Sequence, residues 1–463
     1  MKNKFNSIKK VFTLIAIITF GCTYGQDTIP LQDTQFSLEE AIIYGLEHNY
    51  SANNARTDIA IALKQKWEII AQGLPQISGA ANYQNQLVQP VTFIPGVIAG
   101  GEAGTFIPVT FGTKQSLNAI ATWDQLIFDG SYIVGVQSAK TLLKISENAK
   151  VKTDLELKEE IINAYGNVLL AEESVAILKK NLSSLQKNYE DTRKIFENGL
   201  AEEEDVEQLQ ITLIGLQSNL DNAVRMQSIA SDMLKVTLGI PLDYNISVTD
   251  DLDELAMQYF DLSLLRKSIS VEDNIDYRIA EDQANQAEIL VKLEKSKSLP
   301  KLTAYLNYGV QGNSEKFTFF SDNQRYFDQS ILGVNLSVPV FSSGMRSART
   351  AQQELAYKQK LEDLEETRNR VKLQISSAQN DYQFSLDNYD NQKKNLALAE
   401  RIENKNQIKF FEGIATSFEL SEAQRQLYQA QQNYLQAMLD VITNKATLEK
   451  VLDTTEYQPK ERN

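Results

Sequence analysis

Apolar residues recur at alternating steps of three and four along two segments of the chain, 206–234 and 420–448. The first seam consists of Val206, Leu209, Leu213, Leu216, Leu220, Ala223, Gln227, Ala230 and Leu234. The second consists of Leu420, Ala423, Leu427, Ala430, Tyr434, Ala437, Val441, Asn444 and Leu448, each 214 positions further along. This spacing is typical of two helices wrapped around each other. Because each seam starts shortly after a glycine, the pattern predicts one long helical hairpin that occurs twice.

The distribution of proline predicts where the long helices lie. No proline stands between Pro108 and Pro241 or between Pro339 and Pro459. A proline inside a helix costs about 3 kcal/mol, so these stretches favour unbroken helices at 131–196 and 345–411. At 1.5 Å per residue each would be roughly 100 Å long. The return helices, 203–238 and 417–452, cover half of that length, and we expect the short amphipathic helices 37–72 and 268–298 to cover the other half.

Between the short and the long helix of each copy, polar and apolar residues alternate. This period of two predicts strands with two different faces, at 76–88, 116–128, 302–311 and 330–341. In the last one Leu332, Val334 and Leu336 alternate with Gly333 and Asn335. These lengths suit tilted strands that cross an outer membrane, and interfacial aromatic residues are available. We expect that role for Tyr83, Trp123, Tyr308 and Tyr326.

Four strands are too few for one chain to form a membrane barrel. Their open edges would be unsatisfied in hydrocarbon, and the smallest known barrels have about eight strands. Three chains that contribute twelve strands are the economical solution. We therefore expect a mainly α protein with membrane β structure: a barrel of long α-helical hairpins, plus four β-strands per chain that complete a 12-stranded trimeric β-barrel.

The expected organisation is a signal peptide, 1–26, followed by two structural repeats. Repeat 1, 27–245, comprises a short helix, a β-hairpin at 76–128, the long helix 131–196 and the return helix 203–238. Repeat 2, 246–463, comprises the short helix 268–298, a β-hairpin at 302–341, the long helix 345–411 and the return helix 417–452.

The N-terminal segment is typical of an export signal. It has a basic stretch, the apolar run 11–20, and small residues before Gln26. Cys22 follows Gly21, which leaves lipid attachment as an alternative to ordinary cleavage near Gly25 or Gln26. The mature chain is therefore expected to be exported.

Composition excludes several functions. The formal net charge is −15, which argues against nucleic acid as a partner. One cysteine and one histidine, Cys22 and His48, exclude a zinc cluster or a Ser/His/Asp triad. We expect no enzyme, no catalytic residues, no metal and no cofactor. Two alternatives to a channel stay open: an exported soluble coiled-coil scaffold or adhesin, and, more distantly, a carboxylate-dependent cell-wall enzyme.

The order of helix, strand hairpin, long helix, turn and return helix, present twice, resembles the TolC-like outer membrane efflux proteins. The motifs that carry the resemblance are Leu74-Pro75, Leu299-Pro300, Phe128-Asp129-Gly130, Gly199-Leu200-Ala201 before Asp205-Val206, and Leu238-Gly239-Ile240-Pro241. The resemblance covers essentially the whole mature chain. It implies a homotrimeric duct in the outer membrane of a Gram-negative bacterium, with its helices in the periplasm. It also implies a periplasmic adaptor (membrane fusion protein) and an inner membrane RND or ABC transporter as partners.

The resemblance also assigns candidate site residues. The helix turns that meet the adaptor would consist of Gly199, Leu200, Ala201, Gly413, Ile414 and Ala415. Glu419 and Glu422, three apart on one helix face, match an acidic pair at the periplasmic entrance, where a ring of carboxylates favours cations. Asp205 matches a residue that latches this gate by pairing with an arginine. Ala415 stands at the arginine's position, so any latch must use other contacts.

Overall fold

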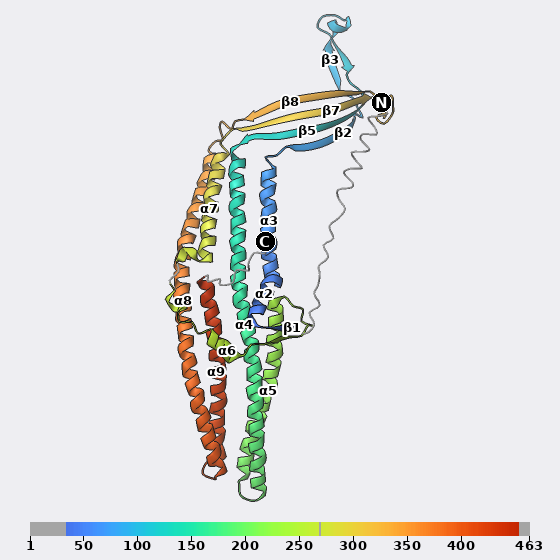
Figure 1. The fold of residues 1–463 in the computed structure, drawn as a ribbon. Coiled ribbons are helices and arrows are strands. Elements are labelled where there is room, and N and C mark those ends of the chain that lie inside the picture. Colours follow the sequence, from blue (N-terminus) through green and yellow to red (C-terminus); the bar gives the residue numbers. More distant parts are fainter. Residues whose placement is uncertain (1–33, 268–269, 453–463) are drawn as a thin grey trace.

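The computed structural model describes residues 34–267 and 270–452. The expected signal peptide, 1–26, and both predicted fates of Cys22 therefore lie outside the described residues. Figure 1 shows an elongated molecule in which long helices run side by side, with a curved β-sheet at one end and two helix turns at the other. The strands cross the helix ends at a steep angle instead of continuing along the helix axes (Figure 1).

The elements of the first half follow the expected order. They are α2 (Leu38–His48), α3 (Tyr50–Ala71), β2 (Gln76–Asn85), β5 (Gln115–Asp129), α4 (Gly130–Glu197) and α5 (Glu203–Leu238). The prediction of one unbroken short helix at 37–72 was wrong, because Asn49 has extended backbone angles and interrupts it. The Asn49 side chain accepts a hydrogen bond from the Ser51 N–H at 2.6 Å and donates one to the Thr237 carbonyl at 2.7 Å. The break thus ties the short helices to the end of α5.

The second half repeats this order. Its elements are α7 (Ile275–Ser296), β7 (Lys301–Ser314), β8 (Tyr326–Ser337), α8 (Met345–Phe411) and α9 (Ser417–Val451). The short helix expected from 268 begins only at Ile275, where Asn274 caps it by accepting from the Asp276 N–H at 2.9 Å. The strand expected at 330–341 lies earlier and ends at Ser337. Pro339 explains the early end, because it has no N–H to donate to a ladder.

Several short elements were not expected. The β2–β5 connection contains a second hairpin, β3 (Val91–Pro95) and β4 (Phe106–Thr110), joined through the 3₁₀ turn η1 (Gly96–Ala99). The segment between the halves contains β6 (Ile246–Val248), α6 (Leu252–Gln258) and the 3₁₀ turns η2 (Leu264–Arg266) and η3 (Val271–Asp273). β6 pairs in parallel with β1 (Thr34–Phe36). This pairing crosses the boundary between the two expected repeats.

The main hydrophobic core lies midway along the helices, where α2, α4, α6 and α9 meet. Two tyrosines without solvent exposure lie in this core, Tyr165 on α4 and Tyr382 on α8. Both contact the segment that connects the two halves of the chain. The Tyr165 hydroxyl lies 2.8 Å from a carboxylate oxygen of Asp250, and the Tyr382 hydroxyl donates to the Tyr259 carbonyl at 2.6 Å. Within the described residues, α4 is the one helix with a stretch apolar enough for a membrane span, at mean hydropathy 1.2. Part of that stretch packs in this core, where Ile161 and its apolar neighbours on α4 are buried, and 39% of the stretch is buried in all.

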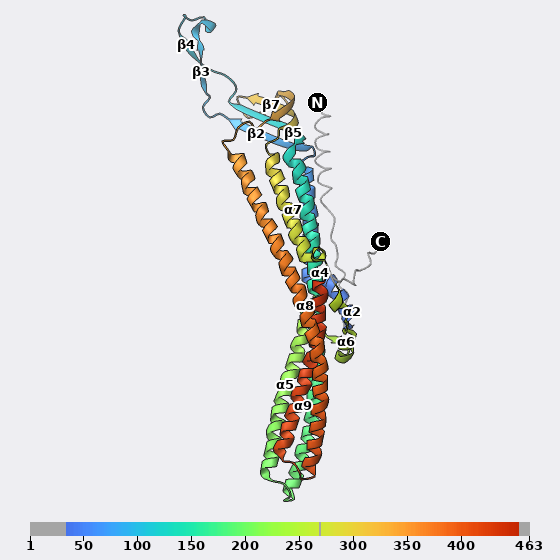
Figure 2. The ribbon, with the colours of Figure 1, turned by 90° about the vertical axis from the view of Figure 1, so that its left-hand side faces the viewer.

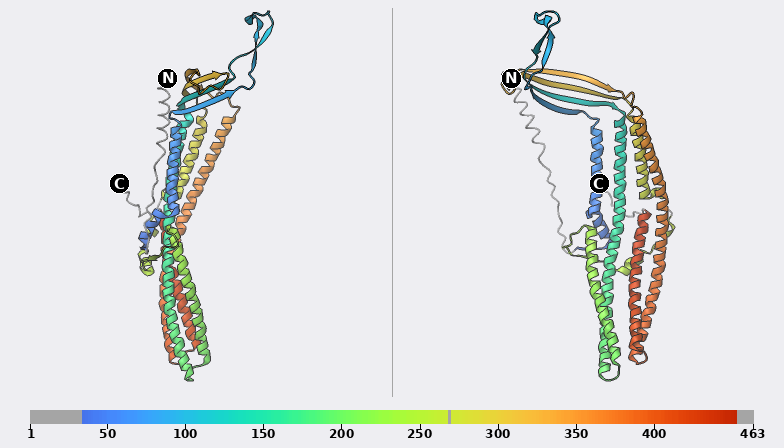
Figure 3. Two further views of the ribbon diagram at one scale, coloured as in Figure 1. Left: turned by 90° about the vertical axis from the view of Figure 1, so that its right-hand side faces the viewer. Right: turned by 180° about the vertical axis from the view of Figure 1, so that it is seen from behind.

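Both predicted seams are confirmed by burial. Every seam position on α5 and α9 is buried or half-buried, while most neighbouring positions on α5 are exposed. Figures 2 and 3 show that the α4–α5 and α8–α9 hairpins lie beside each other and end at the same end of the molecule. The four-stranded sheet at the opposite end has the order β2-β5-β7-β8, so β2 and β8 are its two edges.

Candidate functional site

The four-stranded sheet has one apolar and one polar face. In its register, Ile77, Trp123, Leu306 and Leu332 stand directly opposite one another across all four strands. Since side chains opposite each other share a face, this row belongs to one surface. Leu332 is 74% exposed and Ile77 is 79% exposed. The apolar face therefore has no cover within the described chain.

The other face is predominantly polar. Its side chains include Gln76, Ser78, Asn82, Asn118, Thr122, Asp124, Thr303, Asn307, Gln311, Gln329 and Asn335. Ile120, Phe327 and Ile331 also stand on this face. The predicted alternation is thus confirmed as a property of the whole sheet, with Ile120, Phe327 and Ile331 as exceptions.

All four predicted interfacial aromatics stand on the apolar face. Trp123 lies in the middle of β5, opposite Ile77, whereas Tyr83 and Tyr326 share a row near the end of the sheet remote from the helices. Six residues separate Ile77 from Tyr83, which is about 20 Å along an extended strand. With the strands tilted by about 40°, the two levels are about 15 Å apart along the barrel axis, which fits within the apolar band of an outer membrane wall, about 25 Å tall.

Both helix turns at the opposite end have the same backbone structure. Gly199 and Gly413 have φ of 77° and 71°, a left-handed conformation that glycine adopts without strain. The Leu200 N–H bonds to the Ile195 carbonyl at 3.0 Å, and the Ile414 N–H bonds to the Lys409 carbonyl at 2.8 Å. These bonds, with those of the glycine N–H groups, complete a Schellman motif at each turn. Among the tip residues, Leu200 is 80% exposed and Ile414 is 70% exposed, while Ala201 and Ala415 are half-buried.

Of the predicted gate residues, Asp205 and Glu419 begin the return helices at matching positions. Each is the third residue of its helix and forms a capping box with the residue before the helix. The Asp205 carboxylate accepts a bond from the Glu202 N–H, and the Glu419 carboxylate accepts one from the Thr416 N–H at 2.8 Å. Carboxylates in a first helical turn also interact favourably with the helix dipole. Helix capping alone therefore gives both residues a structural role.

Glu422 has different partners. It forms an ion pair with Arg425, one turn away on the same helix, and accepts a hydrogen bond from Gln426 at 3.0 Å. It also lines a small groove of about 290 Å³ between α5 and α9, together with Gln208 and Ser421. Asp205 and Glu419 do not line this groove. A single chain therefore does not gather the three predicted gate carboxylates into one site.

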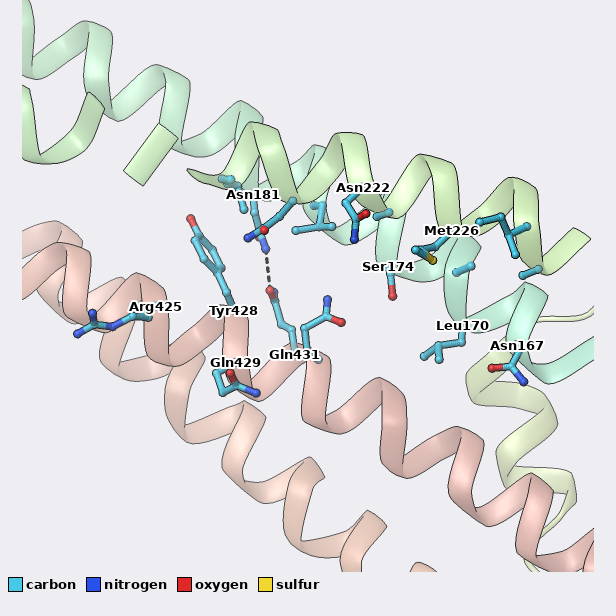
Figure 4. A pocket seen from close by; sticks show the side chains of 18 of the residues that line it. Asn167, Leu170, Ser174, Asn181, Asn222, Met226, Arg425, Tyr428, Gln429 and Gln431 are labelled. Atoms are coloured by element: carbon cyan, nitrogen blue, oxygen red, sulfur yellow. Dashed lines mark hydrogen bonds between the residues drawn. The ribbon is translucent and has the colours of Figure 1, made fainter. Parts of the chain in front are cut away.

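The contact between the two hairpins is rich in amides, which the sequence analysis missed. The Asn181 amide on α4 donates to the Gln431 side chain on α9 at 2.7 Å (Figure 4). Closer to the turns, Gln407 donates to Asn188 at 3.2 Å. Asn188 follows Asn181 by seven residues on the long helix, a heptad spacing that marks one helix face. That spacing is the sequence signal that could have indicated a polar contact here.

A groove of about 700 Å³ lies between α5 and α9 beside this contact. Its lining combines amides such as Asn222 and Gln429 with apolar side chains such as Met226 and Leu170 (Figure 4). It contains no group of His, Cys, Asp or Glu side chains that could hold a metal ion, and the described residues form no such group elsewhere. The groove is therefore a feature of how the hairpins pack.

Each hairpin also holds one half-buried glutamate within its helix pair. Burial raises the pKa of Glu172 on α4, although a hydrogen bond from Gln227 opposes the shift. Burial likewise raises the pKa of Glu403 on α8, opposed by a hydrogen bond from Gln424. In both cases removal from water disfavours the charged carboxylate.

Comparisons with known proteins agree with this architecture. The sequence profile of the outer membrane efflux protein family matches residues 268–454. Outer membrane protein TolC of Vibrio cholerae is 23% identical over 343 residues, which are 74% of this chain and 78% of TolC. The alkaline protease secretion protein AprF of Pseudomonas aeruginosa is 24% identical over 309 residues, but the match spans only 60% of the length of AprF.

Solved structures share the fold across nearly the whole chain. CusC superposes with a TM-score of 0.71 at 16% identity, covering 93% of this chain and 95% of CusC. VceC of Vibrio cholerae gives 0.69 at 17% identity, covering 90% and 95%. The chain is therefore similar to the TolC-like outer membrane efflux proteins, whose family profile matches its second half and whose fold it shares over nearly its whole length.

Proposed function

We propose that three copies of this chain form a passive export duct between the periplasm and the exterior, as the outer membrane channel of a tripartite efflux or type I secretion system. The observation that carries this proposal is the sheet with one apolar face, one polar face and two free edges, set on helices of 68 and 67 residues. The apolar face would meet outer membrane lipid and the polar face would line the duct.

The free edges support a trimer. Within the described chain, β2 pairs only with β5 and β8 pairs only with β7. Backbone groups at such edges cannot stay unpaired in hydrocarbon. Pairing of β2 in one copy with β8 in the next satisfies both edges, and three copies close a ring of twelve strands. The helical hairpins of the three copies would then form the periplasmic tube.

The helix turns would be the docking site for a periplasmic adaptor, which links the duct to an inner membrane RND or ABC transporter. Gly199, Leu200 and Ala201 in one turn correspond to Gly413, Ile414 and Ala415 in the other. Two exposed apolar side chains, Leu200 and Ile414, stand at the extreme end of the molecule, where a partner could bury them. The duct itself needs no enzymatic chemistry, in keeping with its channel relatives.

Trimer formation can be tested with two arginine variants of the same strand. Leu332→Arg places a charge on the apolar face, where it costs about 2–4 kcal/mol in lipid, whereas Gln329→Arg places it on the polar face. We expect heat-resistant trimers and planar-bilayer conductance from the native chain and Gln329→Arg, and a large loss of trimer from Leu332→Arg. A native chain that is recovered as a soluble monomer without conductance would instead support the scaffold or adhesin alternative.

The gate is a separate part of the proposal. Three copies of Glu419 and Glu422 would put six carboxylates around the periplasmic entrance. Asp205, at the start of the other return helix, α5, would lie at the same end. We expect Glu419→Gln with Glu422→Gln to lower the cation preference of the conductance. Thr416→Ala is the matched control, since it removes the capping side chain of α9 and keeps both charges. Unchanged ion selectivity in the double variant would exclude these residues from the gate.

A further inference from the structure

The β3–β4 hairpin stands apart from the rest of the molecule. Its strands form a separate two-stranded sheet, and Figures 1 and 2 show it standing up from the four-stranded sheet, on the side away from the helices. Because β2 starts after α3 and β5 ends before α4, their connection lies at the sheet end remote from the helices. In the proposed channel that end faces the cell exterior.

The hairpin is almost uncharged and its apolar side chains are uncovered. From 86 to 114 the charged residues are Glu102 and Lys114. The large apolar side chains that are exposed by half or more are Leu87, Val88, Val91, Phe93, Val97, Ile98, Phe106 and Phe111. Isolated two-stranded hairpins are marginal in water, and a contiguous apolar surface of this kind marks an interaction site.

The tip of the hairpin is nevertheless built as an ordered structure. The Gly96 N–H donates to the Thr105 carbonyl at 2.7 Å, and the Gly101 N–H donates to the Gly96 carbonyl at 2.8 Å. A Cβ at Gly96 would lie 2.1 Å from the Thr105 hydroxyl, so the two segments approach closely. The hairpin therefore presents Val97 and Ile98 from a defined turn.

The other connection at this end of the sheet behaves differently. Residues 315–325 fold back on their own chain, where the Tyr326 hydroxyl donates to the Phe319 carbonyl at 2.6 Å. The Phe319 and Tyr83 rings lie 5.8 Å apart. Phe319 is only 3% exposed. That connection buries Phe319 within the chain, although Phe317 and Phe320 stay 58% and 87% exposed, whereas the β3–β4 hairpin buries no large apolar side chain.

A second copy of the chain is the partner that fits best. Membrane hydrocarbon does not fit, because the outer edges of β3 and β4 carry unpaired backbone groups. The hairpin grows from β2, the edge strand that the proposed trimer joins to its neighbour. Twelve strands spaced about 4.8 Å and tilted about 40° close a ring roughly 24 Å across. The segment 86–95 spans about 30 Å when extended, so each hairpin reaches the central axis.

We propose that the β3–β4 hairpins of the three copies pack against one another over the outer mouth of the channel, through Val91, Phe93, Phe106 and the tip residues Val97 and Ile98. This proposal rests on the proposed trimer. It gives a function to a hairpin whose large apolar side chains are uncovered within the described chain.

Cysteine cross-linking in the full chain tests the contact. Ile98→Cys places a thiol at the tip, and Leu87→Cys places an equally accessible one at the root, with exposures of 76% and 83% for the native residues. After oxidation of outer membranes with copper-phenanthroline, we expect Ile98→Cys to give at least tenfold more disulfide-linked dimer than Leu87→Cys, because the roots stay about 20 Å apart around the ring. Val97→Cys is a second tip variant, and the native chain controls for Cys22.

The outcomes separate this inference from the proposed channel. Trimers on unheated gels without a tip-specific disulfide, in variants whose thiols a maleimide labels, would overturn the hairpin contact and leave the channel standing. Linkage of the tip to a different protein, without self-linkage, would also overturn it. Absence of the trimer itself would count against the proposed function instead.

Discussion

The two helical hairpins have the same outline but different interiors. Both end in a Schellman turn at a glycine, and both begin their return helix with a capping box. Between α4 and α5, however, the cluster of buried residues is mostly leucine, including Leu185 and Leu209 at 0% exposure. Between α8 and α9 the corresponding cluster is smaller and contains Ala399, Leu427 and Ala430. Equal shape therefore does not require equal packing.

The second hairpin has, in addition, polar contacts with the long helix α4 of the first. Asn181 and Asn188 of α4 bond to α9 and α8 respectively. Nearer the core, Glu159 of α4 accepts from Lys450 of α9 at 2.6 Å. The comparison indicates that α4–α5 is held by its own hydrophobic seam, whereas α8–α9 depends more on α4.

The largest expected effect comes from the leucine seam. Leu185→Ala should lower the free energy of local unfolding of α4–α5 by about 2–4 kcal/mol, because it leaves a cavity in a closed cluster. Leu427→Ala, at 9% exposure in the looser cluster, should cost less. Native-state hydrogen exchange of the two hairpins measures both values. Equal losses would contradict the conclusion that the α4–α5 hairpin is the more tightly packed of the two.

A smaller effect tests the dependence of α9 on α4. Asn181→Ala removes the donor to Gln431 and should cost about 0.5–1.5 kcal/mol, the net contribution of one hydrogen bond, because the Gln431 side chain is only half-buried. We expect protection to fall in α9 more than in α5. The double variant Asn181→Leu with Gln431→Leu should recover part of the loss. An equal fall in α5 and α9 would contradict the proposed dependence.

The turns should respond alike. Gly199→Ala and Gly413→Ala each force an alanine into a left-handed conformation, at about 1–2 kcal/mol. Neither glycine has a neighbouring atom within 4 Å of a built Cβ. Steric clashes should therefore not make the stability losses of the two variants differ. Gly215→Ala, equally free of neighbours but inside α5, should instead stabilise by up to about 1 kcal/mol. Thermal unfolding of the trimer compares all three, and clearly unequal tip variants would show that one turn has further contacts.

The smallest effect concerns pH. Because burial raises the pKa of Glu403 above its ordinary value of 4.5, its contribution to stability is present below that value and is lost as pH rises through the folded pKa. Glu403→Gln should therefore stabilise the protein at pH 7, by less than about 1 kcal/mol because the side chain is partly hydrated, and change little at pH 4. Glu172→Gln in the other hairpin should behave similarly. Melting curves at both pH values test the pair, and a destabilised Gln variant at pH 7 would contradict the assignment.

Among the candidate site residues, sequence placed the helix turns correctly at the ends of the hairpins. It missed the polar contact of Asn181 with Gln431, because an amide on a long helix is more often solvated than paired. It also predicted no strand between 88 and 116, although that segment forms β3 and β4. The apolar run there did not alternate clearly, and its prolines suggested irregular structure.

The sequence by itself determined the elements whose signal is periodic. Heptad steps set the seams, the absence of proline permitted α4 and α8, and alternation divided the sheet into two faces, because each of these depends on residues close together in the chain. Tertiary structure alone decided what joins distant segments. The break at Asn49 is fixed by a bond to Thr237, β1 pairs with β6 across two hundred residues, and α9 is held by amides of α4. Such contacts leave no local pattern, since each partner is an ordinary polar or extended residue until the fold brings the other beside it.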